Sequence, residues 1–139
     1  MIVRYVILSP SEEARQAFLG SLFGTFELSP RGHGEKVTFS VEGGDLEIVG
    51  TGVEGRLKDM ALKLLEGGVQ VDGILFLIPS GDTSSWSEAE AVSQWARSND
   101  LSILVNTRGY DSLSDLNKEA ARETLMVLIN EHEQNVAAG

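Results

Sequence analysis

The chain of 139 residues contains no cysteine, only two histidines and no apolar run of membrane-spanning length. Without cysteine it forms neither disulfides nor thiolate metal sites. His33 and His132 are far apart in the sequence, so no histidine zinc site and no other metal site is expected. A membrane span needs about 20 consecutive apolar residues, and we predict none. The chain opens without a charged lead followed by an apolar stretch, so no signal peptide is expected.

Positive charge is also scarce. The chain has 11 Lys and Arg against 21 Asp and Glu, which gives a formal net charge of −10. Such a surface repels the phosphates of nucleic acids and of anionic membranes, so neither is an expected partner. An acidic surface of this kind is typical of cytoplasmic proteins, and the cytoplasm is the expected compartment. A hydrophobic content of 42% is ordinary for a globular protein, and the length suits one domain covering residues 1–139.

Strand and helix patterns alternate along the chain, and Gly43-Gly44 is typical of a two-residue turn joining two antiparallel strands. The predicted strands are Ile2–Leu8, Lys36–Glu42, Asp45–Val49, Gly73–Ile78 and Leu101–Val105. The predicted helices are Glu12–Phe23, Glu54–Glu66, one that starts at a capping box on Ser85 and one from after Ser114 to about Glu133. Alternation of this kind predicts an α/β fold, a three-layer αβα sandwich. Its five-stranded, mostly parallel sheet has the order 2-3-1-4-5 and one antiparallel edge hairpin.

The turn after the first strand reads Ser9-Pro10-Ser11-Glu12-Glu13. Proteins of this build commonly bind phosphate at that turn, through free backbone N–H groups at the start of a helix. Here Pro10 has no N–H to donate, and two carboxylates stand beside the anion position. We predict instead a capped helix start, with Ser9 as N-cap, Pro10 as first helical residue and Glu12 completing the capping box. Such a turn has no room for a phosphate.

Three later segments, together with the element order, resemble the Ras-like small GTPases. They are Glu47-Ile48-Val49-Gly50-Thr51-Gly52-Val53-Glu54, Phe76-Leu77-Ile78-Pro79-Ser80-Gly81-Asp82-Thr83-Ser84-Ser85-Trp86 and Ile103-Leu104-Val105-Asn106-Thr107-Arg108-Gly109. The resemblance covers about residues 1–111 and implies a small-GTPase-like, P-loop-type layout. The motifs themselves are degraded, so the chain is identified as resembling a degenerate member of the family, a pseudo-GTPase.

Each nucleotide-binding motif of the family is altered. Arg15 stands where the phosphate-binding lysine belongs, and Gln16 replaces the magnesium-binding hydroxyl. Val53 occupies the place of the glutamine that orients water, so no catalytic residue is expected. Asn106 fits the first residue of the guanine-reading motif, but Gly109 replaces its aspartate. If GTP or GDP with Mg²⁺ does bind, the resemblance implies these ligands: Arg15, Gln16, Asn106 and Asp111.

The leading hypothesis is a non-catalytic protein-interaction or regulatory module, not an enzyme, that binds no nucleotide appreciably and needs no cofactor. The resemblance implies an interaction surface formed by the segment Gly24–Glu35, the second strand and the turn at Gly50–Arg56. Its candidate residues are Ser29, Arg31, His33, Lys36, Thr38, Thr51, Glu54 and Arg56. The expected partner is a protein, either another GTPase or its regulator. The edge strand Lys36–Glu42 can also pair with a second copy to form a homodimer.

Two alternatives stay open. The first is a divergent small GTP-binding protein with weak or atypical nucleotide binding. The second is a receiver-like phosphosignalling domain, in which Glu12 and Glu13 would imitate the acids that follow the first strand. A receiver also needs an aspartate at the end of its third strand and a lysine after its fifth. Here Val49-Gly50 and Arg108 stand at those places.

Overall fold

The computed structural model describes residues 2–22, 36–41, 44–53, 55–67 and 70–138. The strands are β1 (Ile2–Leu8), β2 (Lys36–Val41), β3 (Gly44–Gly50), β4 (Gly73–Pro79) and β5 (Leu104–Tyr110). The helices are α1 (Glu12–Leu22), α2 (Leu57–Glu66), α3 (Thr83–Ser98) and α4 (Lys118–Ala138), with a short 3₁₀ helix, η1 (Leu113–Asp115), before α4. No described helix is both long and apolar enough to cross a membrane.

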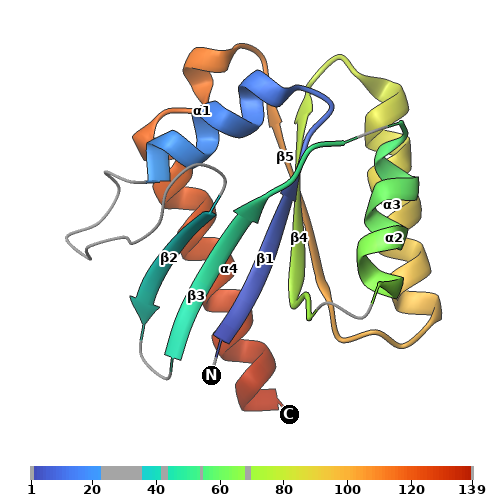
Figure 1. Cartoon of the computed structure of the whole chain (residues 1–139), viewed down its shortest axis with the longest axis vertical. Helices are drawn as coiled ribbons and strands as arrows, with labels where there is room; N and C mark the ends of the chain where they lie inside the picture. Colours follow the sequence, from blue (N-terminus) through green and yellow to red (C-terminus); the bar gives the residue numbers. More distant parts are fainter. Residues whose placement is uncertain (1, 23–35, 42–43, 54, 68–69, 139) are drawn as a thin grey trace.

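The sheet order is β2-β3-β1-β4-β5. Only β2 and β3 pair antiparallel, and the other neighbours are parallel. Helices α1 and α4 lie on one face of the sheet, and α2 and α3 lie on the other (Figure 1). The predicted three-layer sandwich, its strand order and its antiparallel pair are therefore confirmed.

Two apolar clusters hold the layers together, one on each face of the sheet. The first contains Tyr5, Phe18 and Phe39 beneath α1 and α4. The second contains Leu8 and Phe76 beneath α2 and α3. Strand β4 supplies both clusters, and its residues Gly73–Ile78 are all buried, as expected of a central strand with helices on both faces.

The helix layers do not cover the whole sheet. On the α2 and α3 side, the apolar cluster takes its sheet residues from β4, β5 and the carboxyl half of β1. Figure 1 shows that β2, β3 and the amino end of β1 extend beyond these two helices, with no described helix over them on that side. Polar residues lie on this part of the sheet, and they supply part of the candidate site.

Several predicted boundaries were wrong at the level of a few residues. Helix α3 begins at Thr83, because the Asp82 carboxylate accepts the Ser85 N–H at 3.1 Å and caps the helix. The predicted capping box on Ser85 is therefore absent, and the Ser85 hydroxyl donates to Asp82 Oδ2 at 2.7 Å. Strand β5 begins at Leu104 and continues to Tyr110, well beyond its predicted end at Val105.

Candidate functional site

The carboxyl ends of β1, β3, β4 and β5 meet at one edge of the sheet, where ligands bind in folds of this kind. At the β1–α1 turn, the Ser9 Oγ accepts the Ser11 N–H at 3.1 Å. The Ser11 Oγ accepts the Ala14 N–H at 3.2 Å. Helix α1 begins at Glu12, so Ser11 is the N-cap and Ala14 the third helical residue. Two amides near the helix start are thus already bound within the chain.

The predicted capping box of Ser9 and Glu12 was wrong. The second serine caps the helix instead, which leaves Pro10 outside the helix and exposed. The Glu12 side chain is exposed and accepts a hydrogen bond from Gln16 Nε2 at 3.3 Å. Gln16 is also exposed on α1. Side chains of the chain itself therefore bind two amides of this turn, Ser11 N–H and Ala14 N–H, though the residues differ from those predicted.

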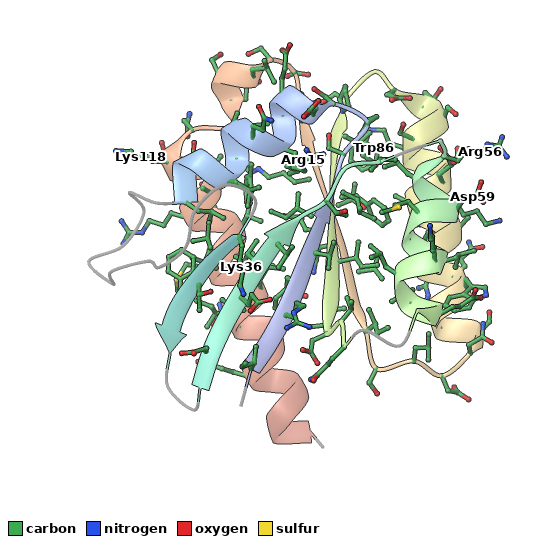
Figure 2. The ribbon with its side chains drawn as sticks, viewed as in Figure 1. Arg15, Lys36, Arg56, Asp59, Trp86 and Lys118 are labelled. Carbon is green, nitrogen blue, oxygen red and sulfur yellow. The ribbon has the colours of Figure 1, made fainter. Side chains whose placement is uncertain are left out.

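Arg15 is buried, with only 5% of its surface exposed. Its Nη1 donates to the Thr51 carbonyl at 3.0 Å, and its Nη2 lies 3.7 Å from Glu12 Oε1. Figure 2 shows Arg15 beneath α1 at the carboxyl edge of the sheet. The guanidinium therefore links α1 to the β3–α2 segment. Its position next to Ala14, within the inner stripe of the helix, is the signal that sequence reasoning missed.

Trp86 lies at the carboxyl ends of β4 and β5. Its indole Nε1 donates to the Pro79 carbonyl at 3.0 Å. The ring also lies against Gly109, where an added Cβ would come within 2.9 Å of a ring carbon. The Ser80 N–H donates to the Tyr110 carbonyl at 2.9 Å and joins the two strand ends. The indole thus covers the glycine at which the family resemblance placed the base-reading aspartate.

The four residues proposed as nucleotide ligands do not form a site. Asn106 lies in the middle of β5, paired with Leu75 of β4, and its Nδ2 donates to Glu131 Oε2 on α4 at 2.8 Å. Asp111 is exposed after β5, and its N–H donates to Asp115 Oδ2 at 3.1 Å. The proposed base-reading match was wrong because β5 continues through it.

No metal centre forms within the described ranges, which hold no group of three or more His, Asp or Glu side chains suited to an ion. A hollow of about 400 Å³ lies beside α2, and its lining residues are Gly52, Val53, Asp59, Met60 and Lys63. Among its described lining residues, one carboxylate and one ammonium group form no constellation for nucleophilic or acid–base catalysis. Figure 2 shows Asp59 on the outer side of α2.

The best-organised polar cluster lies on the uncovered area of sheet. We call this area the β2–β3 face and define it by Arg4, Lys36, Thr38, Asp45 and Glu47. Glu47 is 7% exposed. It accepts Arg4 Nε at 2.7 Å on Oε1 and Lys36 Nζ at 3.2 Å on Oε2. Burial raises the pKa of Glu47, but the hydrogen bonds from Arg4 and Lys36 outweigh it, so the pKa lies below its ordinary value. The Arg4–Glu47–Lys36 cluster was not predicted, although strand alternation places the three residues on one face.

The predicted interaction residues are only partly brought together. Lys36 lies on β2 within the β2–β3 face (Figure 2). The half-buried Thr38 belongs to the same strand and face. Thr51 is engaged through its carbonyl by Arg15. Arg56 is exposed at the start of α2, 3.9 Å from a Glu88 carboxylate oxygen of α3. Four further candidates lie outside the described residues, namely Ser29, Arg31, His33 and Glu54.

No protein-family model matches the chain, and no curated protein matches it. Among solved structures, the G235P variant of SsGBP is 10% identical, with a TM-score of 0.47 over 96% of this chain. This chain spans 54% of the length of that protein. Futalosine hydrolase of Helicobacter pylori strain 26695 is 10% identical over 96% of this chain and 99% of its own, with a TM-score of 0.36.

The cytosolic domain of the T. maritima FeoB iron transporter, in its GMPPNP form, is 12% identical over 88% of this chain and 63% of its own. Its TM-score is 0.37. These likenesses carry no functional argument, and they place a futalosine hydrolase beside an iron-transporter domain. Nothing in them distinguishes the Ras-like family, so the identification as a degenerate member of that family was wrong.

Proposed function

We propose that the protein is a non-catalytic interaction module that binds another protein chain through the β2–β3 face and the adjoining edge of β2. The observation that carries this proposal is the part of the sheet over which no described helix lies on the α2 and α3 side. Its central carboxylate, Glu47, is held by Arg4 and Lys36. Side chains ordered in this way lose little conformational freedom when a partner covers them. The surface is therefore preorganised for binding.

Contacts at the carboxyl edge of the sheet support the second part of this proposal, that the protein does not bind a nucleotide. The serine hydroxyls bind amides at the start of α1, and Arg15 is committed to the Thr51 carbonyl. Glu12 and Glu13 are exposed in the first turn of α1 and would repel a triphosphate. A nucleotide would have to break these contacts and approach two carboxylates.

Calorimetric titration with GTP, GDP and ATP in the presence of Mg²⁺ tests this part of the proposal. We expect no binding tighter than about 10 μM, which corresponds to about 7 kcal/mol. Tighter binding of any of the three would favour the divergent nucleotide binder and contradict the proposal. For the receiver-like alternative, incubation with acetyl phosphate followed by mass measurement should show no added phosphoryl group.

The proposed partner is a protein. The expectation that it is a GTPase or a GTPase regulator depended on the family resemblance and is withdrawn with it. The net charge of −10 supports a protein over nucleic acid as partner. It also suits the cytoplasm, which is the compartment that we propose.

A matched pair of variants tests the binding surface. Thr38→Arg places a long charged side chain in the middle of the β2–β3 face. Thr107→Arg makes the same change on β5, the opposite edge strand, where Thr107 is exposed. Affinity capture from an extract of the source cells, quantified by mass spectrometry, should recover the same proteins with wild type and Thr107→Arg. Thr38→Arg should lose them. Equal capture by all three chains would contradict the proposed surface.

A further inference from the structure

The edge of β2 has backbone groups that β3 does not use. The Thr51 N–H donates to the Ile7 carbonyl of β1 at 3.4 Å, so odd-numbered residues of β3 direct their main-chain groups toward β1. Its even-numbered residues face β2, where Leu46 pairs with Phe39 and Ile48 with Val37. The main-chain hydrogen bonds to β3 therefore use the odd-numbered residues of β2. The even-numbered residues of β2 direct their N–H and C=O groups outward, and they are Lys36, Thr38 and Ser40.

The other edge strand of the sheet is protected in a way that β2 is not. The Leu104 N–H and the Tyr110 carbonyl bond toward β4, so Val105, Thr107 and Gly109 carry the outward main-chain groups of β5. Beside them, Arg108 turns toward α4 and donates to Thr124 Oγ1 at 3.0 Å. An inward-pointing charge is a known device against edge-to-edge pairing of sheets.

On β2 the corresponding inward positions are apolar. Val37 and Phe39 are fully buried on the side of α1 and α4. The strand contains no proline. Its one charged residue, Lys36, stands at its first position and is engaged by Glu47 at 3.2 Å. The described part of β2 thus lacks the inward charge that protects β5.

We propose that β2 pairs antiparallel with β2 of a second copy of this chain, about a two-fold axis at Thr38, so that the two sheets become continuous. This inference rests on the proposed function and deepens it, because it names the occupant of the surface. In this register Thr38 faces Thr38 of the second copy, and Lys36 faces Ser40. The outward N–H and C=O groups of each facing pair then bond to one another.

The strand is self-complementary in that register. The central pair is Thr–Thr, and Val37 faces Phe39 of the second copy on the helix-covered side. Threonine pairs and pairs of aromatic with β-branched residues are both favourable across strands. The charges also match, because Lys36 begins β2 while Asp45 pairs with Ser40 near its other end. An antiparallel two-fold therefore places Lys36 of each copy on the side of Asp45 of the other.

The net charge of −10 per chain opposes association at low ionic strength. Measurements therefore belong at about 0.15 M salt, where the Debye length is about 8 Å. Sedimentation equilibrium of the wild-type chain should give twice the 15.0 kDa mass of one chain. A single-chain mass throughout the micromolar range would overturn the inference.

A proline pair identifies the strand responsible. Thr38→Pro removes an outward N–H from the centre of the interface without breaking a bond to β3, and should raise the dimer dissociation constant at least about tenfold. Thr107→Pro removes an equivalent outward N–H on β5, with the same constraint on the backbone, and should leave the dimer intact. A dimer that survives Thr38→Pro would contradict pairing through β2.

Engineered cysteines test the register, because the chain has no cysteine of its own. Residues that face each other in a bonded antiparallel pair have Cα atoms about 5.5 Å apart, within the range that a disulfide spans. Thr38→Cys should therefore form a cross-linked dimer on oxidation. Lys36→Cys, which faces Ser40, should not. Failure of Thr38→Cys to cross-link would overturn the proposed register.

These outcomes separate the inference from the proposed function. A monomeric wild-type chain whose captured protein is still lost in Thr38→Arg would overturn the dimer and leave the interaction module standing. Tight nucleotide binding would defeat the proposed function whatever the mass of the chain.

Discussion

Replacing Gly73 with alanine should destabilise the protein through a clash at the centre of the sheet. Gly73 opens β4 and pairs with Tyr5 of β1. A Cβ at this position would come within 2.2 Å of the Tyr5 ring, and it would lie 3.1 Å from the Leu104 carbonyl oxygen. Carbon atoms in contact are ordinarily about 3.5–4.0 Å apart. The Tyr5 ring, or the backbone around it, therefore has to move by more than an ångström.

Tyr5 has little freedom to move. It is completely buried, and its hydroxyl donates to the Leu128 carbonyl of α4 at 3.1 Å. Overpacking of a core costs about 1–3 kcal/mol, and loss of the tyrosine hydrogen bond would add about 0.5–1.5 kcal/mol. We therefore expect the free energy of unfolding to fall by about 2–4 kcal/mol, a large part of the 5–15 kcal/mol typical of a protein.

Urea unfolding followed by circular dichroism measures the loss, by linear extrapolation. Gly52→Ala is the matched control, because no atom lies within 4 Å of its added Cβ, and it should change stability by less than about 0.5 kcal/mol. Tyr5→Leu should lessen the cost of Gly73→Ala in the double variant, since the ring atoms are removed. Tyr5→Phe should lessen it only by the hydrogen-bond part, about 0.5–1.5 kcal/mol, since the ring that causes the clash remains. A cost below about 0.5 kcal/mol for Gly73→Ala would refute the packing argument.

Three further predictions concern buried polar groups. Folding lowers the pKa of Glu47. The ionised carboxylate therefore stabilises the fold fully above the pKa of the unfolded chain, about 4.3, and this stabilisation is lost as the pH falls through the folded pKa. Urea unfolding from pH 7 down to pH 3 should therefore show a smaller acid-side loss in Glu47→Gln than in wild type, and equal losses would contradict this.

The pKa of Tyr5 is raised, chiefly by burial and further by the charges of Glu131 and Asp72. The contribution of Tyr5 to stability is therefore complete below its pKa in the unfolded chain, about 10, and is lost as the pH rises above that pKa. Tyr5→Phe should therefore reduce the fall in the free energy of unfolding at alkaline pH. An unchanged slope would contradict this role of Tyr5. Arg15→Met keeps the buried volume but removes the donor to the Thr51 carbonyl, and should lower the free energy of unfolding by about 1–3 kcal/mol; an unchanged urea midpoint would show that this link contributes nothing.

Much of the fold could be predicted because its signals are local. The apolar residues of β1 and β4 and the periodic stripes of the helices each report on their own element, and alternation of the elements leaves few topologies. The same locality limited the prediction of element ends. Strand β5 is half exposed along Asn106, Thr107 and Arg108, so its polar residues resembled a loop, and the apolar stretch before it was taken for the strand.

The family resemblance went wrong for a related reason. A layout of strands and helices is shared by many α/β proteins, whereas a binding motif depends on where each residue falls relative to a strand end. Asn106 matched a motif in the sequence, but it lies within β5 and bonds to Glu131 of α4. Only the extent of the strand and the position of α4 reveal that difference.

The sequence by itself determined the layers, the strand order and the absence of thiol chemistry, because these follow from hydrophobic period and composition. Tertiary structure alone decided that Arg15 bonds to Thr51 and that Arg4 and Lys36 meet on Glu47. It also decided which part of the sheet the described helices leave uncovered. These features join residues that are distant along the chain, and a contact of that kind depends on how whole elements pack, which no local pattern encodes.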